Sequence, residues 1–325
     1  MQPGAAFINL RKMDLEGCLM HSILWSRATD ARSRRLSKAA LVILLGAMSA
    51  HIPLAVAESE AGSGSTANIN KELLNPNTSL ASLTFRSQYR WYEGDLPGAD
   101  SQSNATFLFQ PVFPIDLGRT ESDTATKKFF LRPAIPYQVD VPVFDPTKNE
   151  FEDDSGLGDI GFDAAYGLSW DTGTQFVAGL VGSLPTASGD VPGGNANLGP
   201  EIFGGHAGSY GFIGGLLTHS WDISDWSDND VSNTSLQAFF SFVLPNSWAA
   251  GSIPIMSYDW KSDEATIPLN VYAQKTIKIG NTPTRIQVEF NWYLSQPDPF
   301  GPEYFIALNI TPVVSNPFQK FFDPR

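Results

Sequence analysis

The segment Thr284–Leu294 alternates apolar and polar residues without interruption. Its apolar members occupy every second position: Ile286, Val288, Phe290, Trp292 and Leu294. A period of two belongs to a β-strand with one apolar face and one polar face. A strand of this kind suits a wall between lipid and water. A strand of a soluble β-sandwich shows the same alternation, so the rest of the chain has to distinguish the two folds.

The composition favours an all-β protein. Of the 325 residues, 42% are hydrophobic and 12% are aromatic, whereas only 17% are charged, and glycine (28) and proline (23) are frequent. Few charges combined with many aromatic and turn-forming residues are typical of a β-protein with an unusual surface. The mean hydropathy of -0.12 does not argue against a membrane protein, because alternating strands hide an apolar band from the average.

The first 57 residues are predicted to be an N-terminal extension and a cleaved signal peptide. A basic region at residues 32–38 precedes an apolar core at residues 39–50, and an Ala-Val-Ala cleavage site ends at Ala57. The alternative, an uncleaved membrane anchor, is disfavoured because the apolar core is too short to span a bilayer. The polar residues 58–81 are predicted to form a flexible periplasmic lead-in.

Loss of the leader leaves an acidic chain without cysteine. Residues 1–57 hold seven of the 21 Lys and Arg and three of the 34 Asp and Glu, so 14 basic and 31 acidic residues remain, a net charge near -17. This charge argues against nucleic acid as a partner. The single cysteine, Cys18, leaves with the leader, so the mature chain has no disulfide or thiol chemistry. An exported chain of this kind fits the bacterial periplasm or outer membrane.

Twelve segments between residues 82 and 314 are predicted to be strands of one barrel, followed by a C-terminal tail at residues 315–325. Short and long connections alternate along the chain, as they do in outer-membrane barrels. Phe144–Gly158 is one of the predicted long loops. The alternation breaks at Asp116–Lys127, which is long, and at Lys261–Glu264, which is short. Prolines in the second and third segments predict bulged, short or distorted strands. The twelve segments are Leu83–Tyr92, Ala105–Ile115, Lys128–Val143, Asp159–Trp170, Thr174–Leu184, Leu198–Gly205, Tyr210–Trp221, Ser235–Leu244, Ala249–Trp260, Thr266–Ile279, Thr284–Leu294 and Glu303–Val314.

Several short motifs follow one another in a fixed order. They include residues 155–160 (SGLGDI), 184–186 (LPT), 212–221 (FIGGLLTHSW) and 278–280 (KIG). In order and spacing these motifs resemble a family of bacterial outer-membrane proteins, labelled the MetA-pathway-of-phenol-degradation family and sometimes mislabelled neuromedin U. The resemblance implies an outer-membrane β-barrel with a transport role. Its label adds hydrophobic or aromatic compounds as expected solutes, and it supplies no catalytic residues. The chain departs from many barrels in continuing past its last strand.

Polar residues of the predicted strands are expected to face the lumen. An arginine on the lipid face would cost about 2–4 kcal/mol at the bilayer midplane, so a barrel directs such residues inward. There they would form a polar pore lining or a selectivity ring. The alternative is a network of lumenal ion pairs, such as Arg285 with Glu289, that fills the interior. The predicted lumen lining consists of Arg86, Arg90, Arg132, Gln237, Arg285, Gln287, Glu289 and Asn291.

No catalytic, cofactor-binding or metal-binding residue is predicted. Gly156–Asp159 lacks the third glycine and the following helix of a nucleotide-binding loop. The acidic residues at 150–154 and 222–230 lack the spacing of a calcium-binding EF-hand. A Ser-His-Asp arrangement around His219 is disfavoured because no serine stands in a nucleophile elbow, and His219 is expected in the lumen or at an interface. The chain is therefore expected not to be an enzyme.

The sequence thus predicts an all-β fold, a transmembrane antiparallel barrel of about 12 strands in the bacterial outer membrane. The expected function is a passive channel or transporter for small molecules. The alternative is a non-transporting barrel with a filled lumen that has a structural or surface-interaction role. The expected partners are outer-membrane lipid and lipopolysaccharide, a small-molecule solute and the barrel-assembly machinery. No cofactor is expected.

Overall fold

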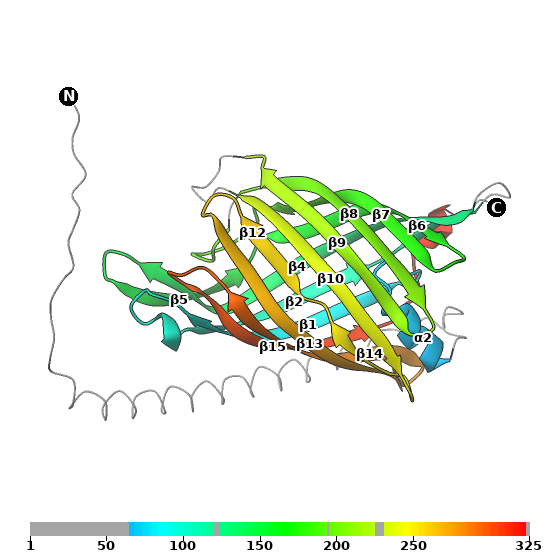
Figure 1. Cartoon of the computed structure of the whole chain (residues 1–325). Helices are drawn as coiled ribbons and strands as arrows, with labels where there is room; N and C mark the ends of the chain where they lie inside the picture. The colour runs from blue at the N-terminus through cyan, green and yellow to red at the C-terminus, as the bar shows by residue number, and fades with distance from the viewer. Residues whose placement is uncertain (1–64, 120–123, 194, 225–230, 323–325) are drawn as a thin grey trace. The chain divides into compact units, whose positions relative to one another are not determined.

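The computed structural model describes residues 65–119, 124–193, 195–224 and 231–322, whose strands form one sheet (Figure 1). The predicted extension and signal peptide at residues 1–57 lie outside the described residues. The strands are β1 (Ser82–Glu93), β2 (Ser103–Val112), β3 (Ile115–Gly118), β4 (Ala125–Asp145), β5 (Glu150–Leu157), β6 (Ile160–Trp170), β7 (Thr174–Leu184), β8 (Asn197–Gly208), β9 (Gly211–Asp222), β10 (Ser232–Leu244), β11 (Trp248–Ser252), β12 (Ile255–Asp259), β13 (Glu264–Ile279), β14 (Thr282–Ser295) and β15 (Gly301–Pro312).

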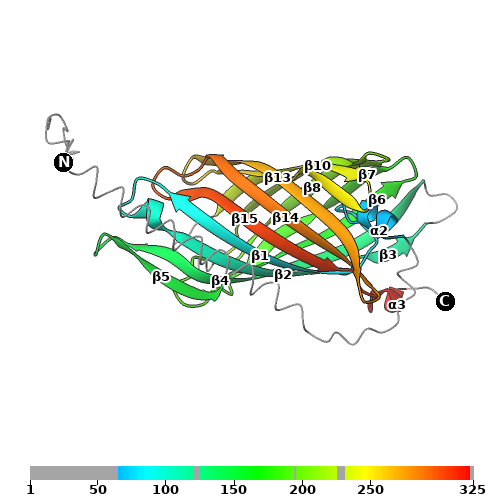
Figure 2. The same ribbon diagram turned by 90° about the horizontal axis from the view of Figure 1, so that it is seen from below.

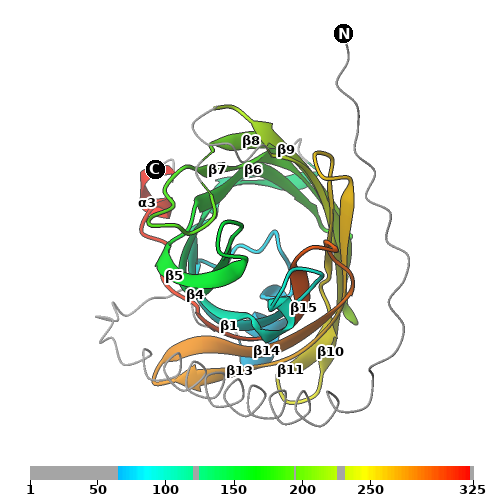
Figure 3. The same cartoon turned by 90° about the vertical axis from the view of Figure 1, so that its left-hand side faces the viewer.

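The sheet closes into a barrel of twelve antiparallel wall positions. The first and last strands pair from Phe85 opposite Ile310 to Glu93 opposite Gly301. Each pair β2/β3, β5/β6 and β11/β12 is one interrupted wall strand, so the 15 strands of the sheet fill twelve positions. Figure 3 shows the resulting ring of strands. The predicted fold class is confirmed, and each of the twelve predicted segments corresponds to one wall position.

Short turns lie at one end of the barrel and most of the long connections lie at the other. Residues 171–173, 209–210, 245–247 and 280–281 are the short turns between strands. β1 begins and β15 ends at the same end as these turns (Figure 2). In outer-membrane barrels the short turns are periplasmic, which assigns this end to the periplasm. The connection between β2 and β4 is shorter than predicted because β3 extends the strand to Gly118.

Two irregular regions occur in the long strand β4. The predicted loop at Phe144–Gly158 is wrong: β4 continues to Asp145 and pairs with β5, leaving only residues 146–149 as the turn. Pairing satisfies the backbone groups of this projecting segment. Of the bulged, short or distorted strands that the prolines predict, the structure has an irregularity in β4 between Gln138 and Val141, where Asp140 has a φ of 53°. The N–H of Asp140 donates to Ser155 Oγ at 3.0 Å, outside the regular ladder.

The outward face of the wall is apolar. On β14 the side chains of Val288, Phe290 and Trp292 are 52%, 41% and 51% exposed, although each is large and apolar. Exposed apolar side chains also occur on β7, β8, β9, β10 and β13. A closed barrel with a continuous apolar exterior is the construction of an outer-membrane β-barrel, because the strands satisfy one another's backbone groups while lipid covers the side chains.

Several tryptophans near the strand ends are exposed on the outside of the wall. Trp221, Trp248 and Trp260 are 49%, 43% and 60% exposed, as expected for a girdle at the membrane–water interfaces. Trp91 differs: it is 3% exposed and stacks on Tyr304 at a centroid distance of 4.6 Å. No helix in the described parts of the chain is long and apolar enough to cross a membrane.

The segment before β1 enters the barrel. Helix α2 (Thr66–Glu72) is capped by Ser65, whose Oγ accepts from the N–H of Asn68 at 3.3 Å, and it lies against β11, β13 and β14. Part of the segment predicted as a flexible lead-in, residues 65–81, thus includes a helix that contacts the wall. We call residues 65–81 the plug segment. After β15, α3 (Gln319–Phe322) lies beside β3, where Gln319 Oε1 accepts from the N–H of Asp116 at 2.9 Å.

Candidate functional site

The lumen is polar along β1, β13 and β14. Because side chains alternate along a strand, the lipid-facing apolar residues of β14 leave their neighbours pointing inward. Gln287, Glu289 and Asn291 are accordingly 4%, 4% and 3% exposed. They lie opposite inward-facing residues of β13, such as Asn270 across from Asn291. The amphipathic strand that dominates the sequence thus supplies one polar wall of the lumen.

A cavity of about 600 Å³ lies against this wall. We call it the arginine cavity because Arg86, Arg90 and Arg285 line it. Its one carboxylate, Glu289, is fully engaged. Glu289 Oε2 accepts from Arg86 Nη1 at 2.8 Å, and Oε1 accepts from the amide groups of Asn270 and Asn291 at 2.9 and 2.8 Å. Three guanidinium groups against one carboxylate give this part of the lumen a formal charge of +2.

Two of the three arginines have no carboxylate partner among the described residues. The guanidinium carbon of Arg90 lies 5.7 Å from the ring centroid of Phe305, and that of Arg86 lies 5.4 Å from the same centroid. The Nε of Arg90 is buried without a hydrogen-bond acceptor. Arg285 donates instead to the backbone oxygen of Leu73 at 3.0 Å and to Thr311 Oγ1 at 3.1 Å. Arg285 therefore joins the polar wall to the plug segment.

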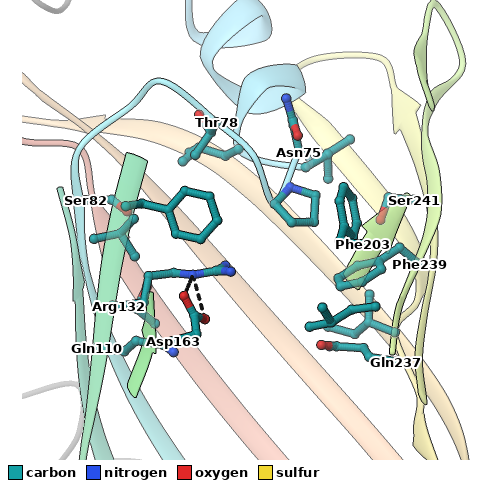
Figure 4. A pocket seen from close by; sticks show the side chains of 18 of the residues that line it. Asn75, Thr78, Ser82, Gln110, Arg132, Asp163, Phe203, Gln237, Phe239 and Ser241 are labelled. Atoms are coloured by element: carbon teal, nitrogen blue, oxygen red, sulfur yellow. Dashed lines mark hydrogen bonds and ion pairs between the residues drawn. The ribbon is translucent and has the colours of Figure 1, made fainter. Parts of the chain in front are cut away.

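A second cavity, of about 310 Å³, lies between the plug segment and the opposite wall (Figure 4). We call it the plug cavity. Leu73, Leu74 and Pro76 of the plug segment line it on one side. An ion pair crosses from β4 to β6 on its wall, where Arg132 Nε lies 2.9 Å from Asp163 Oδ2. The arginine cavity and the plug cavity share the lining residues Thr84, Gln110, Gln237, Ile253, Arg285 and Gln287, so they are adjacent parts of one lumen.

The floor of the plug cavity is apolar and closely packed. Leu74 is buried in one cluster with Phe130, Phe203 and Phe212, which come from β4, β8 and β9. The rings of Phe203 and Phe212 stack at a centroid distance of 5.8 Å. A leucine buried among aromatic rings removes apolar surface from water, which stabilises its side chain by about 2 kcal/mol. This packing fixes the plug segment against the periplasmic half of the wall.

Hydrogen bonds from wall residues hold the plug segment in place. Asn70 is fully buried, and its Oδ1 accepts from Gln274 Nε2 at 3.1 Å and from Thr276 Oγ1 at 2.9 Å. The Nδ2 of Asn70 donates to the backbone oxygen of Trp248 at 3.1 Å. Lys128 Nζ donates to the backbone oxygen of Asn77 at 3.0 Å. The plug segment is thus hydrogen-bonded to β4, β11 and β13 of the wall.

Glu201 is a buried acid in the plug cavity. Its side chain points inward from β8 beside Phe203, and the residue is 2% exposed. Neither carboxylate oxygen has a hydrogen-bond partner. A carboxylate without partners in a buried site is costly. Glu201 therefore contrasts with Glu289, whose oxygens accept three hydrogen bonds.

The structure places all eight predicted lining residues around these two cavities. Arg132, Gln237, Arg285 and Gln287 line the plug cavity, and seven of the eight, all except Arg132, line the arginine cavity. The predicted pair of Arg285 with Glu289 is wrong, because Glu289 pairs with Arg86 instead. Sequence reasoning missed Asp163, Glu201 and the plug segment. The polar–apolar alternation of β8 carried a signal for Glu201, which precedes the outward-facing Ile202.

His219 and the acidic residues at 150–154 do not line either of the two cavities. His219 shares the outward face of β9 with Leu217 and Trp221, and its Nδ1 lies 2.7 Å from Thr234 Oγ1. Residues 150–154 belong to β5, and most of the second acidic cluster lies outside the described residues. In the parts of the chain that the structure describes, no three histidine, cysteine or acidic side chains are grouped as metal ligands.

No protein-family model and no curated protein matches this chain. An outer membrane channel from Pseudomonas putida F1 is similar in structure, with a TM-score of 0.49, 12% identity, and coverage of 72% of this chain and 95% of that one. Outer membrane phospholipase A from Escherichia coli is similar with a TM-score of 0.42, 9% identity, and coverage of 77% and 98%. The beta domain of a Bordetella autotransporter is similar with a TM-score of 0.39, 9% identity, and coverage of 72% and 99%.

These similarities concern the fold and correct one expectation. The motifs of the sequence led to the expectation that the chain is not an enzyme. Outer membrane phospholipase A is an enzyme, and it is among the structurally similar barrels. A barrel of this kind therefore does not exclude catalysis, and the expectation does not stand. The outer-membrane β-barrel fold follows from the closed wall and its apolar exterior.

Proposed function

We propose that this chain is an outer-membrane channel for passive entry of small solutes, closed at its periplasmic end by the plug segment. The observation that carries the proposal is the pair of adjacent cavities inside the barrel. They total about 900 Å³ and are separated from the periplasmic end by residues that come from outside the wall. A structural barrel needs no such continuous polar space.

The plug segment is suited to a gate. It is held by hydrogen bonds and by one leucine among aromatic rings, whereas the wall strands are held by long ladders of paired residues. Elements with fewer buried contacts open at lower free-energy cost than the strands around them. Solute would enter through the arginine cavity, reach the plug cavity and pass when the plug segment moves from the floor.

The resemblance to the MetA-pathway family supports the same role, and we include membership of that family in the proposal. The hydrophobic or aromatic solutes implied by the family label also belong to it, and the aromatic floor of the plug cavity suits them. Lipopolysaccharide around the wall and the barrel-assembly machinery are further expected partners. The signal peptide at residues 1–57 stays a prediction.

A second function is favoured by the plug itself. If the plug segment never leaves the lumen, the barrel is a non-transporting structural or surface-interaction protein with a filled interior. The apolar cluster around Leu74 supports this alternative, because it occupies the lumen at one end. The two functions differ in a single property, which is movement of the plug segment.

Conductance in planar bilayers and solute flux in liposomes test the proposal. The exported protein should show discrete openings, and liposomes that contain it should swell in a panel of small charged, polar and aromatic solutes. A variant with a weakened plug, Leu74→Ala, should open more often. No conductance and no swelling with either protein would contradict the channel and support the filled barrel.

A further inference from the structure

The arginine cavity carries positive charge that nothing else in the described structure neutralises. Glu289 is its one carboxylate, and its two oxygens already accept three hydrogen bonds. No carboxylate that lines this confined space therefore offsets the charges of Arg90 and Arg285. Because the effective dielectric constant between cavity walls is lower than in water, these charges act strongly on a solute there.

Arg90 is the guanidinium group in this cavity that is available to a ligand. Arg86 is occupied by Glu289, and Arg285 by the plug segment and Thr311. Arg90 donates no hydrogen bond and forms no ion pair within the described residues. Its stem packs in the wall, where the Nε is buried, and its guanidinium carbon lies over Phe305. A group held in this way is oriented before a ligand arrives.

The local charge opposes the charge of the whole chain. Residues 58–325, the predicted mature chain, have a net charge near -17. Composition alone would therefore predict an acidic lumen. The three arginines nevertheless line one part of the lumen. Arg86 and Arg90 belong to β1, and Arg285 belongs to β14. β15 lies between these strands, and its Ala307 is small, so Arg86 reaches Glu289 across it.

From these contacts we infer that the arginine cavity is an anion-binding segment of the lumen and that Arg90 contacts a carboxylate of small organic anions directly. A guanidinium group donates two parallel hydrogen bonds to a carboxylate, which suits an arginine that has no other partner. The cavity volume of about 600 Å³ accepts a small organic molecule. The inference assigns a solute class to the proposed channel, and this assignment rests on the proposed function.

The test is a binding measurement that does not require an open channel. Trifluoroacetate, which is an anion, and trifluoroacetamide, which is uncharged and of similar shape, are each titrated into the folded protein in a non-ionic detergent. Binding is followed by the transverse relaxation of ¹⁹F. Trifluoroacetate should relax faster in the presence of the protein and trifluoroacetamide should not. The Arg90→Gln variant should bind the anion at least about tenfold more weakly.

Two further variants complete the test. Arg119→Gln removes the same charge at the periplasmic turn, where Arg119 pairs with Asp171 at 2.8 Å, and it should bind trifluoroacetate as the unchanged protein does. Arg90→Lys should restore part of the binding that Arg90→Gln loses, provided that each variant keeps the heat-modifiable mobility of a folded barrel. Equal anion binding by the Arg90→Gln variant, or equal relaxation of the amide, would overturn the inference.

The inference and the proposed function fail separately. Conductance without trifluoroacetate binding would remove the anion site and leave the channel. Binding without conductance or swelling would leave the anion site and remove transport.

Discussion

The two cavities of the lumen both have mixed polar and apolar linings, and they differ in how their charged side chains are held. The arginine cavity is lined by charged and amide side chains whose carboxylate, Glu289, is fully hydrogen-bonded. The plug cavity has an aromatic floor, and of its two acids Asp163 pairs with Arg132 whereas Glu201 has no partner. One barrel therefore holds an acid that is fully hydrogen-bonded in one cavity and an acid without a partner in the next. The wall that makes them is the same, because alternation on each strand decides only which side chains face inward.

The plug segment contacts the surroundings of the two cavities unequally. Polar side chains around the arginine cavity bond mainly to one another across neighbouring strands. Around the plug cavity they bond to the plug segment, as Gln274 and Thr276 do to Asn70. The cavity with the apolar floor is thus the one that the chain itself occupies, and the cavity with the free guanidinium is left for solute.

The largest expected effect is on the floor of the plug cavity. Leu74→Ala should weaken docking of the plug segment by about 3 kcal/mol, because it removes a side chain packed among three aromatic rings. The open population of the channel should rise by about a hundredfold, measured as open probability in planar bilayers. Leu294→Ala, at an exposed lipid-facing position of β14, is the matched control and should leave the open probability unchanged. An unchanged value for Leu74→Ala would contradict the assignment of the plug as gate.

A smaller effect is expected at the acid of the arginine cavity. Glu289→Gln removes the charge that Arg86, Asn270 and Asn291 share, so the free energy of unfolding should fall by about 2 kcal/mol. Urea unfolding of the barrel, followed by tryptophan fluorescence, measures this change. A variant as stable as the unchanged protein would show that the network around Glu289 contributes little.

The acid of the plug cavity should respond in the opposite direction. Glu201→Gln replaces a buried carboxylate without partners by a neutral amide, so the free energy of unfolding should rise by about 1 kcal/mol. The same urea measurement on Glu201→Gln and Glu289→Gln compares the two cavities directly. Destabilisation by both substitutions to the same extent would remove the distinction between them.

The smallest effect is expected outside the lumen. Hydrogen bonding to Arg119 holds the pKa of the Asp171 carboxyl below its usual range. A depressed pKa contributes stability above the unfolded value, and that contribution is lost as the pH falls through the folded pKa. Because Asp171 is exposed, Arg119→Gln should leave unfolding at neutral pH unchanged within error while raising the carboxyl pKa, measured by NMR titration. A pKa that does not move would show that the pair does not form in solution.

Much of the wall was predictable from the sequence, and the plug was not. Strand β14 and its inward-facing Gln287, Glu289 and Asn291 follow from alternation alone, because a strand in lipid has one apolar face. The plug segment reads as a polar loop, since its order depends on partners far away in the chain. Asn70 bonds to Gln274, which lies 204 residues later, and no local pattern announces such a contact.

Two other differences have local causes. Phe144–Gly158 contains acidic residues and glycine and so resembles a loop, although it pairs as the β4–β5 hairpin. The partner of Glu289 was assigned from neighbours on one strand as Arg285. In the barrel Arg86 of β1 reaches Glu289 instead. It does so across β15, where the residue opposite Glu289 is the small Ala307.

A reversible covalent link between the plug segment and the wall is the sharpest test of whether movement of the plug segment opens the channel. Thr66 Oγ1 of α2 and Ser247 Oγ of the β10–β11 turn lie 3.2 Å apart, and residues 58–325 contain no native cysteine, so T66C/S247C places a disulfide between plug and wall. Single-channel conductance of the double variant is measured oxidised and after reduction, with Ser247→Cys alone as the control. The account predicts that the oxidised double variant is silent and that reduction restores the openings of the unchanged protein. Equal conductance of the oxidised and reduced forms would contradict it.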